Sequence, residues 1–172
     1  NKNILLIHHV ENLQTWWNGL TQPWRDVFVK INPVLDQAEP SIEVISSLIG
    51  LDSLDLSGGN IINLGPVLKF KKIVSLYFDQ TDVMDLSPLA DIKTLVKITG
   101  RNTKVTSLQP LANLTNLESA DFRKSPIASI AQLSGLENLK YLNVDHANIS
   151  EDEVIRAVYK NPNLNVIFRS IE

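Results

Sequence analysis

The sequence contains no cysteine, and this absence removes several kinds of site at once. Disulfide bonds, thiolate metal centres and cysteine nucleophiles all require thiol groups. Long apolar runs are missing as well, because the longest, Ile4 to Ile7, is far below the roughly 20 residues that span a bilayer. The sequence therefore excludes a disulfide-stabilised scaffold and predicts no insertion into a membrane.

An excess of basic residues is the third absence. Lys and Arg number 16 against 19 Asp and Glu, which gives a net charge of -3 and a pI near 5.6. A chain with this balance does not attract nucleic acid through its overall charge. The 172 residues are 44% hydrophobic, enough for one core or one elongated stack, so we expect one continuous domain and a monomer. The first residue is Asn1 and not Met, which favours an exported protein or a fragment.

The main positive feature is a period of 22 residues that starts at Ile42. Written in rows of that length, five rows align without an insertion, and columns 1, 4, 7, 10, 13, 15 and 20 are apolar. Only Gly100, in column 15, departs from the pattern. Column 1, for example, contains Ile42, Leu64, Leu86, Leu108 and Ile130. Such regularity does not arise by chance, so the chain is a repeat protein.

The spacing inside each row predicts what a row folds into. The first apolar columns are three residues apart, which is typical of a 3₁₀ turn, and columns 13 and 15 are two apart, which is typical of a strand. Stacked rows of this kind form a right-handed coil with a parallel sheet on one face and short turns on the other. The prolines Pro66, Pro88 and Pro110 share a column and are expected at the first position of each turn, with Ser87 as a cap.

Different patterns flank the repeats. Two amphipathic helices are predicted before them, with apolar faces formed by Leu13, Trp16, Trp17 and Leu20 and by Trp24, Val27, Phe28 and Ile31. The segment "ILLIHHV" is ambiguous between strand and helix. After the repeats, "SEDEVIRAVYKNPNL" predicts a full helix, followed by a strand from Leu164 to Arg169 and about three extra residues in this row. We expect a helical cap over 1–41, five repeats over 42–151 and a capping helix and strand over 152–172.

The stretches "LSPLADIKTLVKITGRNTKV" and "LQPLANLTNLESADFRKSPI" resemble bacterial leucine-rich repeats of 22 residues, the class also found in internalins. The N-terminal "WW" and "PWRDVF" are similar to a segment of leucine-rich repeat proteins from gut Bacteroidetes. The resemblance implies an α/β solenoid that recognises a protein, or in some cases a glycan, on its concave sheet face, without enzymatic activity or a cofactor. It also favours an exported or surface-exposed bacterial protein.

Column 18 departs from the family, whose repeats carry an asparagine ladder there. This column contains Gly59, Thr81, Thr103, Ser125 and Ala147. Hydroxyl groups can still bond the backbone of the turn, whereas Gly and Ala cannot, so we expect backbone or water to serve those two turns.

The candidate binding residues lie in columns that alternate with the buried ones and therefore point outward from the sheet. They are Tyr77, Asp79, Lys97, Arg101, Asp121, Arg123, Tyr141 and Asp145. Asp79 is predicted to pair with Arg101, and Arg123 with Asp145, because adjacent strands are about 4.8 Å apart. The charges either neutralise one another for solubility or form a contact patch with the tyrosines, since Tyr and Arg dominate binding hot spots.

Other chemistry is poorly supported by the sequence. His8 and His9 are adjacent and point apart, and His146 has only Asp145 beside it, so no metal site is predicted. Ser150 and His146 lack the context of a nucleophile elbow. The tryptophans could stack on sugars, but their helical spacing favours a core role. The alternative to a protein-binding solenoid is a structural or glycan-binding module of a larger bacterial surface protein.

A first prediction concerns the cooperativity of the stack. A single row buries too little apolar surface to offset its ordering entropy, so each row depends on its neighbours. We expect Leu117→Asp, in column 10, to unfold several rows together. A thermal melt of this variant that matches the parent would contradict the prediction.

Overall fold

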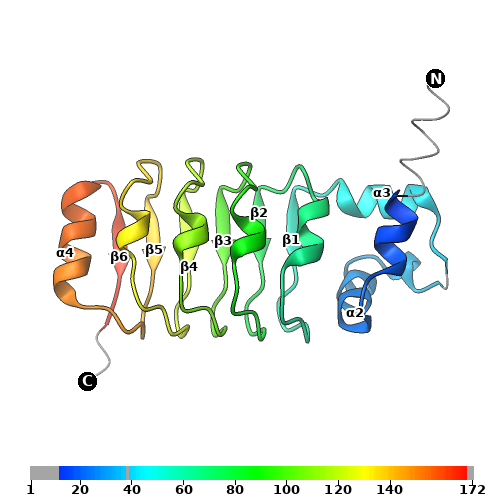
Figure 1. The fold of residues 1–172 in the computed structure, drawn as a ribbon, viewed down its shortest axis with the longest axis horizontal. Coiled ribbons are helices and arrows are strands. Elements are labelled where there is room, and N and C mark those ends of the chain that lie inside the picture. Colours follow the sequence, from blue (N-terminus) through cyan, green and yellow to red (C-terminus); the bar gives the residue numbers. More distant parts are fainter. Residues whose placement is uncertain (1–11, 38, 170–172) are drawn as a thin grey trace.

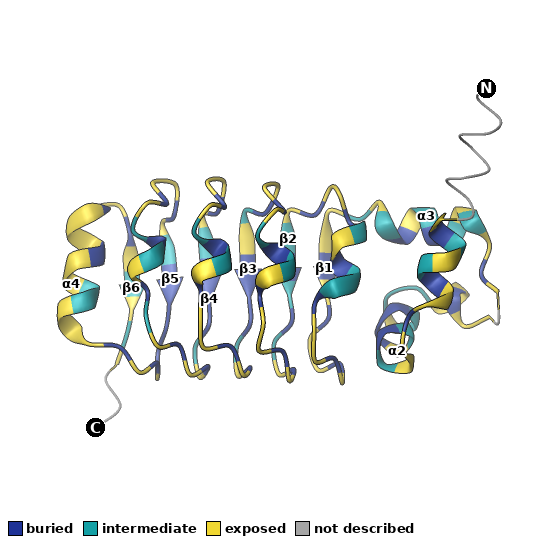
Figure 2. Ribbon diagram, viewed as in Figure 1, coloured by how far each residue is buried: buried dark blue, intermediate teal, exposed yellow. Residues whose placement is uncertain are grey.

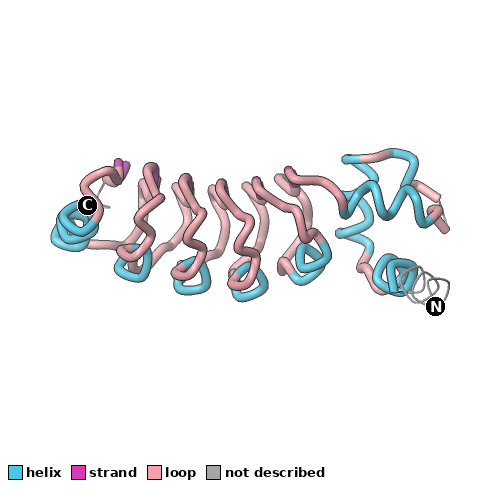
Figure 3. The backbone as a smooth tube through the Cα atoms, turned by 90° about the horizontal axis from the view of Figure 1, so that it is seen from above, coloured by secondary structure: helices cyan, strands magenta, loops and turns pink. Residues whose placement is uncertain are grey.

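The structure is a computed structural model that describes residues 12–37 and 39–169. Its centre is a six-stranded parallel sheet in which each strand pairs with the next one in sequence (Figure 1). The strands are β1 (Ser53–Asp55), β2 (Ser75–Tyr77), β3 (Lys97–Thr99), β4 (Ser119–Asp121), β5 (Tyr141–Asn143) and β6 (Asn165–Ile167). The helical turns lie on the opposite side of the stack (Figure 3). The predicted α/β leucine-rich repeat solenoid is therefore confirmed.

The 3₁₀ turns begin with a side-chain contact that the sequence pattern did not reveal. They are η1 (Pro33–Leu35), η2 (Gly65–Lys69), η3 (Ser87–Leu89), η4 (Gln109–Leu111) and η5 (Ala131–Leu133). Ser87 is not a cap but the first residue of η3, and its N–H donates to Asp85 Oδ1 at 2.8 Å. Pro88 consequently takes the second position. Asn63, Ser107 and Ser129 accept equivalent bonds in the other coils.

The strands pair in register at the 22-residue period. Leu54, Leu76, Ile98, Ala120 and Leu142 are aligned across the first five strands, and Val166 continues the row on β6. The first five are completely buried, and buried residues line the inside of every coil in Figure 2. Leu117 is also completely buried, as its column predicts.

Gly100, the one exception to the apolar columns, has a steric explanation. A Cβ atom at this position would lie 2.6 Å from the ring of Phe78 and 2.9 Å from that of Phe122. Those two rings pack against each other edge to face, with centroids 6.3 Å apart, across the coil that contains Gly100. The glycine therefore completes the core, because its neighbours above and below fill the space of the missing side chain.

The turn after each strand is held by column 18, as predicted. Thr81 Oγ1 donates to the carbonyl of Phe78 at 2.7 Å, and the hydroxyls of Thr103 and Ser125 both donate to the carbonyl of Gly100. The N–H groups of Gly59 and Ala147 bond the backbone three residues earlier, so backbone serves these two turns. The preceding residue has a positive φ in every coil: Gly58, Gln80, Asn102, Lys124 and His146.

The N-terminal cap consists of a helical segment over 12–18, α2 (Gln22–Ile31) and α3 (Ile42–Ile49). Trp17 and Trp24 are buried and Trp16 is partly buried, which confirms a core role for the tryptophans. Phe28 of α2 packs on Phe70 of the first full coil, with ring centroids 5.8 Å apart. The segment "ILLIHHV", with His8 and His9, lies outside the described residues.

The C-terminal end is closed by α4 (Glu151–Lys160) in place of a 3₁₀ turn. Ser150 caps this helix, and Glu153 accepts hydrogen bonds from the Ser129 hydroxyl and from the N–H groups of Ile130 and Ala131. Tyr141 pairs with Asn165, 24 positions later, so the last coil has two extra residues and not about three.

The packing around Gly100 generates a second prediction. Gly100→Ala overpacks two buried rings and is expected to lower the free energy of unfolding by about 1–3 kcal/mol. Adding Phe78→Leu vacates part of the ring volume, so the double variant should be less destabilised than the sum of the single changes. Chemical denaturation of the four proteins measures this coupling.

Gly135→Ala is the matched control, because a Cβ there meets nothing within 4 Å. It should change stability by less than about 0.5 kcal/mol. Additive effects of Gly100→Ala and Phe78→Leu would contradict the steric explanation.

Candidate functional site

The candidate site is the outward face of the sheet, called here the concave face. Tyr77, Lys97, Asp121 and Tyr141 lie on strands β2 to β5, and Asp79, Arg101, Arg123 and Asp145 follow those strands by two residues. Four successive coils therefore bring all eight predicted residues onto one face. They do not form a single cluster, however, since they divide into a central ionic network and two flanking groups.

Asp121 is the centre of the ionic network. Its carboxylate accepts from Arg101 Nε at 3.0 Å and from Arg123 Nε at 3.1 Å. Asp121 is 2% exposed, although it points outward, because these two side chains cover it. The guanidinium groups themselves stay 43% and 40% exposed. The hydrogen bond from Asp121 raises the pKa of Arg123 above its ordinary value, so this side chain stays charged.

One of the two predicted ion pairs is present. Arg101 Nε lies 3.6 Å from Asp79 Oδ2, and the Arg101 N–H donates to Asp79 Oδ1 at 2.8 Å. The pair of Arg123 with Asp145 was predicted wrongly. Residues two apart on a strand share a face, so Asp121 is close to Arg123 within its own coil and takes it as partner.

Asp145 instead holds the last coil to the sheet. It accepts from Arg169 Nε at 2.9 Å, and His146 Nδ1 lies 3.2 Å from its other oxygen. The sequence analysis missed Arg169, because the row that contains it carries the two-residue insertion. Extending column 16 across that insertion would have identified it.

Aromatic residues flank the ionic network on both sides. Lys97 Nζ lies 5.3 Å from the centroid of the Tyr77 ring, a cation–π distance. The hydroxyl of Tyr141 accepts from Asn143 Nδ2 at 3.2 Å on the other side. Thr99 lies between β2 and β4 and is 1% exposed, and its hydroxyl has no hydrogen-bond partner within the described part of the chain. The face is thus a preformed layer of Arg, Tyr and Lys side chains over buried polar groups.

Within residues 12–37 and 39–169, no three His, Asp or Glu side chains are grouped as metal ligands would be. The chemistry that the concave face offers is recognition by guanidinium, phenol and ammonium groups.

The Asp145 contact generates a third prediction. Hydrogen bonding by Arg169 lowers the pKa of Asp145 below its ordinary value. A carboxylate with a lowered pKa stabilises the folded state above its unfolded pKa and loses that contribution as pH falls through the folded pKa. Arg169→Gln should therefore reduce stability at neutral pH, and the difference from the parent should shrink in acid. Thermal melts from pH 7 to below about pH 3 test this; a difference that does not change with pH would contradict it.

No protein-family profile and no curated protein sequence matches the chain. Solved structures do. Internalin C2 of Listeria monocytogenes is 27% identical with a TM-score of 0.67, over 75% of this chain and 56% of that one. The internalin InlF of the same organism is 25% identical with a TM-score of 0.62, over 74% and 37% of the two chains. A leucine-rich repeat protein of Leptospira interrogans shares the fold at 21% identity and a TM-score of 0.65, over 73% and 33%.

This chain therefore spans about half or less of the length of these proteins. The 22-residue coils, the parallel ladder and the likeness to two internalins support the same conclusion, which is that the chain is a bacterial, internalin-like leucine-rich repeat protein.

Proposed function

We propose that the chain is a non-enzymatic protein-binding solenoid that holds its partner on the concave face. The observation that carries the proposal is the pair of guanidinium groups that Asp121 fixes in place while leaving them 43% and 40% exposed. Arginine side chains that are already ordered lose little entropy on binding, and Arg and Tyr are the residues most enriched in binding hot spots.

The surface fits a partner of mixed charge. Arg101 and Arg123 can each donate further hydrogen bonds to carboxylate or carbonyl oxygens, while Asp79 remains partly exposed beside them. Tyr77 and Tyr141 supply apolar area on either side. We therefore infer a folded protein surface with an acidic centre and apolar surroundings as the partner.

A glycan platform made of tryptophans is less well supported, because Trp17 and Trp24 are buried in the cap. We further propose that the protein acts outside the cell or at the surface of a bacterium. In the described residues, every helix is too short or too polar to cross a bilayer.

The fourth prediction tests the concave face directly. Arg101→Glu combined with Tyr141→Ala reverses one guanidinium charge and removes one aromatic side chain. We expect this variant to bind at least about tenfold more weakly to a protein that the parent chain captures from bacterial or host extracts. Binding of the isolated partner to immobilised chain gives the ratio.

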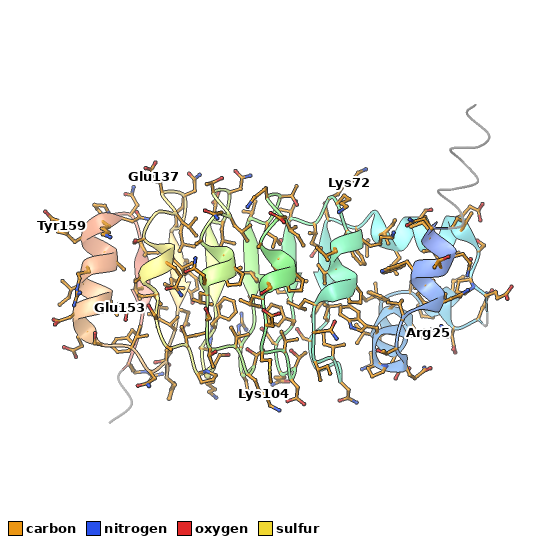
Figure 4. The ribbon with its side chains drawn as sticks, viewed as in Figure 1. Arg25, Lys72, Lys104, Glu137, Glu153 and Tyr159 are labelled. Carbon is orange, nitrogen blue, oxygen red and sulfur yellow. The ribbon has the colours of Figure 1, made fainter. Side chains whose placement is uncertain are left out.

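The matched control is Lys104→Glu combined with Met84→Ala, because both side chains are exposed at the edge of the stack, away from the concave face (Figure 4). It should bind like the parent. Unaltered binding by the concave-face variant would contradict the proposal, and a glycan in place of a protein on the retained material would support the alternative function.

A further inference from the structure

We propose that the C-terminal end of the solenoid is a self-association surface, through which two copies of the chain join in a two-fold symmetric dimer. This inference is independent of the concave face and departs from the monomer that the composition favours. It rests on an apolar helix face, an open sheet edge and a charge pattern at the same end of the molecule.

The helix face is apolar although it faces solvent. Of the residues of α4, only Ala157 is buried. Ile155, Val158 and Tyr159 share the opposite side of the helix and are 64%, 36% and 87% exposed. Figure 4 shows Tyr159 at the outer end of the molecule, pointing away from the coils. An apolar stripe of this kind is typical of a helix that packs against another element on that side.

The helix is held firmly in this orientation. Glu153 binds the start of η5, as described above. At the other end of the helix, Asn161 Nδ2 donates to the carbonyls of Leu136 at 3.2 Å and Leu139 at 2.9 Å. The exposed stripe is therefore a fixed feature of the end face and cannot turn inward without breaking these bonds.

The sheet ends beside this helix with a strand that has one neighbour. Among the described residues β6 pairs only with β5, so the backbone groups on its other side are free to extend the ladder. Ile167 and the partly buried Phe168 add apolar surface next to this edge. A partner that continues the sheet would cover both the edge and the helix stripe.

The charges of α4 indicate that this partner is a second copy. Glu151 and Asp152 are exposed in the first turn, and Arg156 and Lys160 are exposed in the second half. If two α4 helices pack antiparallel, the acidic turn of each faces the basic turn of the other, and the helix dipoles also oppose. The same two-fold axis makes β6 antiparallel to its copy, which permits regular strand pairing.

Head-to-tail stacking is blocked at the other end of the molecule. There α2 packs so closely that a Cβ on Gly59 would lie 2.5 Å from Val27 Cγ2. Because the cap occupies that end, the end face cannot bind the start of another stack and build a filament. A closed dimer remains.

Sedimentation equilibrium of the 172-residue chain tests the proposal. We expect a monomer–dimer equilibrium below a protomer concentration of about 100 µM. Ile155→Ser with Tyr159→Ser should weaken the dimer at least about tenfold, because symmetry counts each change twice. Ile62→Ser with Met84→Ser is the matched control, since these apolar side chains are 66% and 60% exposed elsewhere, and it should not change the equilibrium.

Charge exchange tests the antiparallel arrangement. Asp152→Lys and Lys160→Glu should each weaken the dimer by about tenfold, and the two changes together should restore it to within about twofold of the parent. Because the chain has no cysteine, Val158→Cys provides a second measurement: it should form a disulfide-linked dimer under mild oxidation, whereas Met84→Cys should not.

The proposal is overturned by a chain that stays monomeric at about 100 µM, by larger oligomers, or by a dimer that the end-face changes leave intact. Failure of the charge exchange to restore the dimer would also overturn it. Melting curves monitor folding of every variant, and the exposed positions chosen should leave them unchanged.

Discussion

The stacking of each coil on the next, in register, is the constraint on which the rest of the structure depends. Strands of three residues supply few hydrogen bonds, and no coil buries enough apolar surface by itself. Each coil must therefore present its backbone groups and its apolar columns at the same height as its neighbours. A fixed period of 22 residues does this, and it explains why the five rows admit no insertion until the last coil, where α4 replaces the short turn.

The concave face follows from this constraint. Because side chains from successive coils are brought to fixed spacings, a carboxylate such as Asp121 can bind one arginine in the preceding coil and another in its own. The scaffold thereby converts exposed charges into an ordered layer, in which polar groups such as Thr99 and Asn143 are buried on an outward face. Recognition by such a layer depends on the residues that vary between coils, while the apolar columns stay constant.

The sequence predicted the coils, the strands and the outward columns, because each depends on a period that is visible in one dimension. It did not predict that Asp85 begins the turn of its coil, because a contact to a backbone N–H two residues later leaves no periodic signal in residue type. Arg123 was assigned to the wrong acid, since spacing between rows cannot decide between two carboxylates at similar distances. The role of Gly100 required the sizes of residues 22 positions away on either side, Phe78 and Phe122, to be considered together.

The tight contact between Val27 and Gly59 gives the two ends of the stack a different status from its middle. The first coil is specialised for α2, and the last for Glu153, whereas the coils between them meet neighbours of nearly the same shape on both sides. A gene that gains or loses one 22-residue unit between these ends would leave both terminal contacts intact. Recognition surface can thus be lengthened, shortened or exchanged in whole units during evolution, without rebuilding the parts that make the array soluble.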